Sequence, residues 1–158
     1  MEQYSPHNVS YRNDMLHINR SALVLFSAQQ MYELVNDVDS YPDFLLGCIG
    51  SRVIKTSNNE MTAAVAFAKA GLSNSFTTRN KLLNNKSINM QLVNGPFRKL
   101  MGSWQFTPLG KSACKIQMRL DFEFTNTLIE LVFGDIFKEL AGSMVHAFTN
   151  RANQIYSV

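Results

Sequence analysis

The chain has 158 residues, which is the length of one domain at roughly 100–200 residues per domain. Apolar residues make up 46% and charged residues 17% of the sequence, and this balance excludes a disordered chain, a collagen and a coiled coil. The longest uninterrupted apolar run, 63–68, is far shorter than the ~18 residues that a membrane-spanning helix needs. The cysteines, Cys48 and Cys114, are too few for a disulfide framework or a zinc site, so we expect reduced core thiols in a cytoplasmic protein.

The net charge of +3 conceals a strong segregation along the chain. The segment 50–120 contains 11 basic residues and one acidic residue, Glu60, whereas the rest of the chain carries a net charge of −7. Two interpretations fit this pattern. Either the basic segment meets an anionic partner, such as a phosphate backbone or an anionic lipid surface, or it forms a solvated sheet face that the acidic helices balance across the fold.

The first 14 residues are polar and aperiodic, without the pattern of a signal peptide, so we expect a poorly ordered extension before a single domain at 15–158. From Leu16 to Val24 apolar and polar residues alternate as in a strand. Ser27 and Gln30 then have the spacing of a capping box, which predicts a helix start. Two short helices are expected before the loop glycines Gly47 and Gly50.

The middle of the chain reads as six further strands separated by turns. Their expected ranges are 52–56, 61–69, 73–83, 87–93, 100–106 and 115–124. The last of them alternates without error, which indicates a sheet with one dry face and one wet face. Because the strands follow one another at hairpin spacing, the sheet is expected to be antiparallel.

Apolar residues recur at three- and four-residue steps from Leu128 to Ile155, which predicts one long helix of about 30 residues, or ~45 Å. Thr127 and Glu130 have capping-box spacing at its start, and Gly134 and Gly142 interrupt its apolar stripe. The predicted fold is therefore α+β, with a curved seven-stranded antiparallel sheet wrapped around a long C-terminal helix. No exposed heptad seam is present, so we expect a monomer.

A curled sheet around one helix leaves either a ligand cavity or a filled core. The small residues of the strand 61–69 favour a cavity, whereas the many aromatic residues favour a filled core, as most buried phenylalanines do. The side chains expected to line a cavity are Phe67, Phe76, Trp104, Phe106, Met118, Phe133, Phe137, Met144 and Phe148.

Signals for catalysis are weak. The sequence has no histidine pair at metal-ligand spacing, no G-x-S-x-G elbow and no glycine-rich phosphate loop. His146, on the C-terminal helix, is the best lone candidate for a general base, although a histidine on a helix face more often makes a structural contact. We therefore expect no catalytic residue, no metal and no required cofactor.

Signals for nucleic-acid binding are stronger. Basic side chains on the wet face of the sheet could follow phosphates, but that face lacks the aromatic pair that readers of single-stranded RNA use for stacking. Contact with the backbone of a structured RNA, or with anionic lipid, is therefore expected instead of base reading. The candidate contact residues are Arg79, Lys81, Arg98, Lys99, Lys115 and Arg119.

Segments along nearly the whole domain resemble the START-like superfamily, in particular its coenzyme Q-binding, polyketide-cyclase-like branch and a bacterial group of ribosome association toxins. The resemblance rests on the segments RSALV (20–24), YELVNDV (32–38), SYPDFL (40–45), KAG (69–71), FTTRN (76–80), NGPF (94–97), WQFTPL (104–109), DFEF (121–124), LIELVFG (128–134) and FKELA (137–141). It extends from about Met15 to Tyr156, and no single motif in it is diagnostic.

The resemblance implies the helix-grip fold of START and birch-pollen-allergen proteins, in agreement with the periodicity. It also implies two functions of different classes. One is binding to the large ribosomal subunit, which blocks subunit joining and lowers translation initiation. The other is binding of ubiquinone or a similar lipid in the cavity, in support of respiration. Neither activity needs a catalytic residue, and an enzyme of polyketide-cyclase type ranks last.

Overall fold

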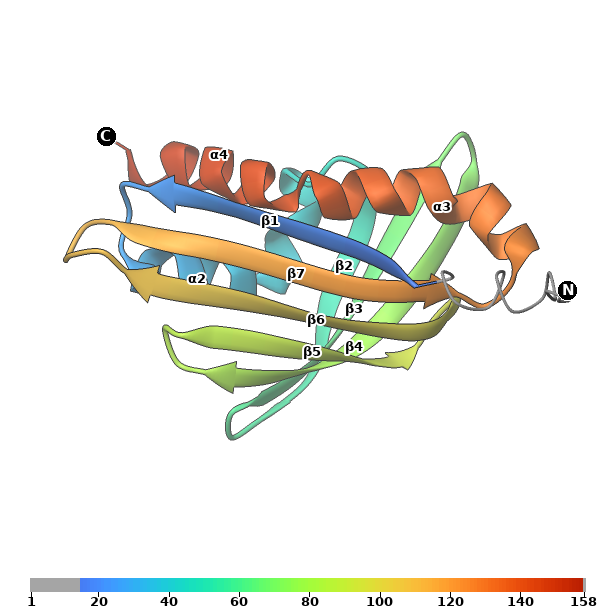
Figure 1. The fold of residues 1–158 in the computed structure, drawn as a ribbon, viewed down its shortest axis with the longest axis horizontal. Helices are drawn as coiled ribbons and strands as arrows, with labels where there is room; N and C mark the ends of the chain where they lie inside the picture. The colour runs from blue at the N-terminus through green and yellow to red at the C-terminus, as the bar shows by residue number, and fades with distance from the viewer. Residues whose placement is uncertain (1–14, 158) are drawn as a thin grey trace, which may run out of the picture.

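The computed structural model describes residues 15–157, so the expected N-terminal extension at 1–14 lies outside the described residues. Seven strands form one antiparallel sheet in the order β1-β7-β6-β5-β4-β3-β2, which confirms the predicted fold class. Figure 1 shows the sheet curving around the C-terminal helices. The strands are β1 (Leu16–Val24), β2 (Cys48–Ser57), β3 (Glu60–Lys69), β4 (Leu72–Leu83), β5 (Ser87–Asn94), β6 (Phe97–Pro108) and β7 (Cys114–Phe124).

Helix α2 (Ala28–Asn36) and the 3-10 helix η1 (Val38–Asp43) carry the chain from β1 to β2, at opposite edges of the sheet. The predicted capping box at the start of α2 is confirmed. The Ser27 hydroxyl accepts a hydrogen bond from the backbone N–H of Gln30 at 3.0 Å, and the Gln30 side chain accepts one from the N–H of Ser27 at 2.9 Å. These bonds satisfy two of the donors that a helix start leaves free.

Two strands begin three or more residues earlier than the alternation predicts. β6 begins at Phe97 instead of Leu100, and its register with β7 shifts between Phe97 and Lys99. β2 begins at Cys48 and contains two such shifts. A β-bulge inserts an extra residue into one strand, so the two-residue periodicity is lost at that point and the sequence pattern underestimates the strand.

The C-terminal segment is not one uninterrupted helix, as the apolar periodicity predicted. Helix α3 (Thr127–Gly142) and helix α4 (Met144–Tyr156) meet at Ser143, although the two segments follow one another along the concave side of the sheet (Figure 1). The interruption is local, because the Ser143 N–H still donates to the carbonyl of Glu139 at 3.1 Å. The predicted capping box is also wrong: the cap is Asn126, whose side chain accepts from the Ile129 N–H at 2.9 Å.

Two aromatic side chains of these helices fill the concave side of the sheet. The Phe137 ring of α3 lies 4.7 Å from Phe97 and 4.9 Å from Phe122, between ring centroids. The Phe148 ring of α4 lies 5.3 Å from Trp104. All five side chains are buried, so each helix is fixed to the sheet by an aromatic cluster of its own.

We predict that Phe137→Ala lowers the free energy of unfolding by about 3–5 kcal/mol, because it removes the ring at the centre of the α3 cluster and leaves a cavity. Urea denaturation measures this difference. Leu131→Ala on the same helix is the matched control, since Leu131 is 80% exposed and its truncation should cost under ~0.5 kcal/mol. Equal losses for the two variants would contradict the assignment of Phe137 to the core.

The position of the α3 cap gives a second prediction. Asn126→Ala should lower the free energy of unfolding by about 1 kcal/mol, because the Ile129 N–H loses its acceptor. Thr127→Ala should change it by less than ~0.5 kcal/mol, since Thr127 is exposed and lies one residue inside the helix. The same urea denaturation applies, and the reverse order of the two effects would show that the cap is Thr127.

Candidate functional site

Alternation along the strands places apolar side chains on the inward face of the sheet, toward the helices, and charged side chains on the outward face. Along β7, Ile116, Met118 and Leu120 are buried against the helices, whereas Lys115 and Arg119, at alternate positions, are exposed. Strand pairing carries this division across the sheet, since residues opposite each other in an antiparallel pair lie on the same face. The outward side chains of all seven strands therefore form one continuous surface, which we call the outer face.

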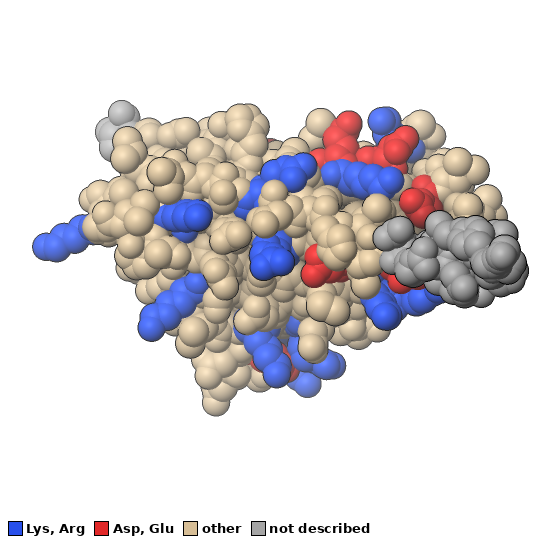
Figure 2. Space-filling view, viewed as in Figure 1, with Lys and Arg blue, Asp and Glu red and all other residues tan. Residues whose placement is uncertain are grey.

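Five of the six predicted contact residues lie on the outer face and are exposed. They are Arg79 and Lys81 on β4, Lys99 on β6, and Lys115 and Arg119 on β7. Figure 2 shows lysine and arginine side chains spread over this face, while most of the acidic side chains visible in that view gather toward α3.

The sixth residue, Arg98, is placed differently. It lies at the β6 bulge, where its guanidinium is 3.0 Å from the carboxylate of Glu123 and donates to the Thr125 carbonyl at 3.1 Å. Arg98 therefore ties the end of β6 to the end of β7, and part of its hydrogen-bonding capacity is already used.

The acidic side chains of the outer face are each held by a neighbour. Glu60 lies 3.8 Å from Arg79, and Asp121 lies 2.6 Å from the ring of His17. Exposed pairs of this kind add little stability, but they offset the acids that would repel an anion. Lys81 and Arg119 form no ion pair with another residue in the range 15–157. The outer face thus keeps uncompensated positive charge.

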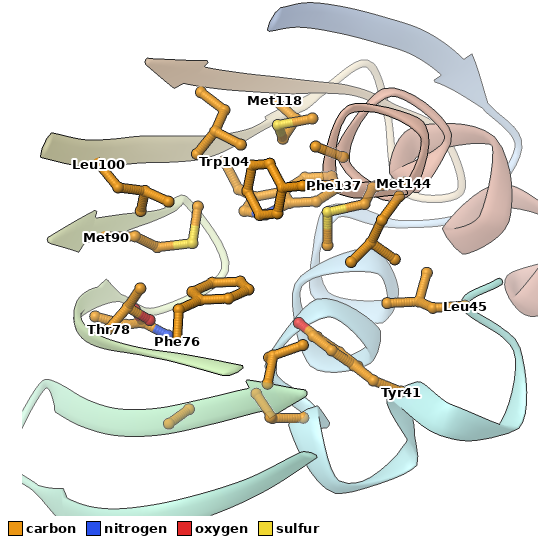
Figure 3. A pocket seen from close by; sticks show the side chains of 17 residues that line it. Tyr41, Leu45, Phe76, Thr78, Met90, Leu100, Trp104, Met118, Phe137 and Met144 are labelled. Atoms are coloured by element: carbon orange, nitrogen blue, oxygen red, sulfur yellow. The ribbon is translucent and has the colours of Figure 1, made fainter. Parts of the chain in front are cut away.

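The concave side holds a small cavity of about 70 Å³ between the sheet and the junction of α3 with α4. Five of the predicted cavity residues line it, as the close-up in Figure 3 shows: Phe76, Trp104, Met118, Phe137 and Met144. The other four, Phe67, Phe106, Phe133 and Phe148, pack in the surrounding core. Drug-sized ligands occupy ~300–1,000 Å³, so the aromatic side chains leave only a residual space.

The cavity wall also contains a polar pair that is not among the residues predicted from the sequence to line a cavity. Thr78 and Asn80 of β4 face inward and are buried, and the Thr78 hydroxyl donates to the amide oxygen of Asn80 at 2.8 Å. No residue in 15–157 accepts a hydrogen bond from the Asn80 amide nitrogen. The alternation along β4 already places both side chains inward, so that pattern was the signal that could have identified them.

Tyr41 is the one titratable side chain among the described residues that line the cavity. Its hydroxyl donates to the backbone carbonyl of Val35, and burial raises the pKa of Tyr41, so it stays protonated. His146 is exposed on α4 and lies 3.2 Å from Asn150, away from the cavity. The general base suggested by the sequence therefore does not face a substrate site.

Both cysteines are buried, as predicted for core thiols, and burial raises the pKa of Cys48 and of Cys114. Within residues 15–157, no group of three or more histidine, cysteine, aspartate or glutamate side chains is placed to hold a metal ion. Over the same residues, no helix combines the length and apolar character that crossing a membrane requires.

Comparison with known proteins shows which family this chain belongs to. The family described as polyketide cyclase / dehydrase and lipid transport matches residues 24–149. Over 143 residues the chain is 62% identical to the ribosome association toxin RatA of Escherichia coli (strain K12), an alignment that covers 90% of each protein. A more distant relative is the mitochondrial coenzyme Q-binding protein COQ10 homolog B of Xenopus laevis, 26% identical over 87% of this chain and 58% of that protein.

Among solved structures, a START superfamily protein from Mycobacterium smegmatis matches with a TM-score of 0.70 and 20% identity, over 88% of this chain and 98% of that one. This likeness confirms the helix-grip fold. The chain belongs to the polyketide cyclase/dehydrase and lipid transport family, with the bacterial ribosome association toxins RatA among its close relatives.

Proposed function

We propose that this protein is a non-enzymatic regulator that binds the large ribosomal subunit in the cytoplasm and prevents its joining to the small subunit. The observation that carries the proposal is the outer face, whose exposed lysines and arginines are not offset by free acids. A relative that is 62% identical to this chain is named ribosome association toxin RatA, and this name supports the proposal.

The physical basis is the release of counterions from ribosomal RNA. A lysine or arginine that neutralises a phosphate frees a condensed cation, so binding weakens as salt rises, with a slope of about 0.7–0.9 in log K against log salt for each contact. A surface of exposed basic residues on a rigid sheet provides several such contacts without ordering a loop. The protein can therefore act by occupying a subunit surface, with no chemical step.

Reversal of four outer-face charges tests this proposal. Arg79, Lys81, Lys115 and Arg119, each changed to Glu, should abolish co-sedimentation with the large subunit while circular dichroism stays unchanged, because all four side chains are exposed. The association of the unchanged protein should fall steeply between two salt concentrations.

A matched variant controls for net charge. Lys69, Lys86, Lys111 and Lys138, each changed to Glu, remove the same amount of positive charge from strand ends, turns and α3. We expect this variant to sediment with the large subunit. If the outer-face variant also sediments with it, the outer face is not the contact surface.

A second candidate function, binding of an apolar ligand, is favoured by the cavity and its polar pair. The free amide nitrogen of Asn80 can donate to a carbonyl or similar acceptor inside an otherwise apolar wall. The COQ10 relative, named for coenzyme Q binding, suggests ubiquinone as one such ligand. Because the cavity holds only about 70 Å³, a ligand as large as ubiquinone would require the α3–α4 segment to move outward from the sheet.

Organic extraction of the purified protein followed by mass spectrometry tests this second function. We expect a stoichiometric apolar compound from the unchanged protein and a loss of about tenfold in Asn80→Leu, since a buried acceptor on the ligand would lose its donor. Ala64→Leu, on the outward side of β3, is the control and should retain the compound. An empty extract from the unchanged protein would contradict the ligand function without affecting the ribosomal one.

A further inference from the structure

We propose that two adjoining hollows on the outer face form a groove that binds the sugar–phosphate backbone of RNA. This inference rests on the proposed function and assigns its contact to particular residues. The first hollow, of about 410 Å³, spans β2 to β5 and is lined by the basic side chains Lys55, Arg79 and Lys81. The second, of about 320 Å³, spans β5 to β7 and includes Arg119. Gln91 lines both hollows, so they meet at this residue.

The strand register explains why a groove forms here. One row of paired residues crosses four strands as Lys55, Thr62, Arg79 and Gln91. The neighbouring row crosses β4 to β7 as Lys81, Asn89, Ser103 and Arg119. In the first row the short side chain of Thr62 lies between Lys55 and Arg79. In the second row Asn89 and Ser103 lie between Lys81 and Arg119, so the surface is lower between the long basic side chains.

The groove is long enough for a stretch of polynucleotide. β2 and β7 are separated by five strand spacings of ~4.8 Å, so Lys55 and Arg119 lie at the ends of a path of roughly 24 Å. A polymer with one phosphate per nucleotide can contact the cations at both ends at the same time. The serine and amide side chains between them can exchange hydrogen bonds with ribose hydroxyls.

Two acidic side chains also line the groove, and each is paired with a neighbouring side chain. Glu60, in the first hollow, lies 3.8 Å from Arg79, and Asp121, in the second, lies 2.6 Å from His17. Lys55, Lys81 and Arg119 form no ion pair among residues 15–157. These three side chains therefore provide the charge available to phosphates.

A membrane fits this surface less well than RNA does. Anionic lipid headgroups lie in a plane, whereas the cations here line hollows on a curved sheet. The exposed large apolar side chains that could enter a bilayer are spread over several elements, for example at the start of α3, where Leu128 and Leu131 are 67% and 80% exposed beside the acidic Glu130. One of them, Met101, which is 50% exposed, lies in the second hollow. Most of the side chains that line the groove are nevertheless polar or charged, which favours a hydrophilic polyanion.

A pair of triple variants tests the groove. The groove variant carries Lys55→Gln, Lys81→Gln and Arg119→Gln, and the matched control carries Lys69→Gln, Lys86→Gln and Lys111→Gln. All six residues are exposed, and each variant loses three positive charges. Fluorescence anisotropy with a labelled RNA hairpin, measured over a range of salt concentrations, gives affinity and salt slope. Parallel titrations use phosphatidylcholine vesicles with and without phosphatidylglycerol.

We expect the groove variant to bind the hairpin about 100-fold more weakly than the unchanged protein near 0.1 M salt, with a salt slope lower by about 2–3. The control should lose less than tenfold, with a slope change below about 1. Equal losses in the two variants, or unchanged RNA binding in the groove variant, would overturn the inference. Loss of binding to phosphatidylglycerol vesicles with unchanged RNA binding would assign the groove to a membrane and would overturn it as well.

Sedimentation of the same proteins with the large ribosomal subunit separates this inference from the proposed function. If the unchanged protein sediments with the subunit while the two triple variants bind RNA equally, the groove is wrong and the ribosomal function stands. If the groove variant alone loses hairpin binding but the unchanged protein does not sediment with the subunit, the groove is supported and the ribosomal function fails.

Discussion

The burial of two aromatic rings, Phe137 from α3 and Phe148 from α4, against the concave side of the sheet is the interaction on which the rest of the structure depends. These rings and their partners leave a cavity of only about 70 Å³. The inward positions of the strands are therefore mostly apolar, and the charged residues point outward. A slip of one residue in any strand would exchange the two faces, so the same packing that stabilises the domain also sets the register of its outer surface.

The proposed location of the binding surface follows from this division between an apolar inward face and a charged outward face. In a family whose description includes lipid transport, the interior would be the expected site. Here the interior is largely filled, and the polar side chains among the described residues that line its cavity include Thr78, Asn80 and the hydrogen-bonded Tyr41. The outer face, by contrast, carries cations on a rigid support. Binding through such a surface depends on long-range attraction and phosphate contacts, which suits a regulator that occupies a large RNA surface.

Much of the outer face could be predicted from the sequence, because apolar and polar residues alternate regularly along β7 and β4. Such alternation fixes which side of a sheet each residue faces. The outward positions of Arg79, Lys81, Lys115 and Arg119 followed from it. The early start of β6 did not, because the bulge near Lys99 breaks the two-residue period. Nor did the interruption at Ser143, since it leaves the apolar stripe intact. The groove depends on which strands are neighbours and on their register, and neither can be deduced from one strand alone.

The most direct test of the outer face as the binding surface is site-specific photo-crosslinking on the large ribosomal subunit. A photoreactive amino acid is placed at Gln91, in the centre of the outer groove, and in a separate variant at Leu131, on the exposed side of α3. Both positions are exposed, so neither replacement should disturb the fold. We expect irradiation to link position 91 to ribosomal RNA and position 131 to none. Links from position 131 with none from position 91 would contradict binding through the sheet.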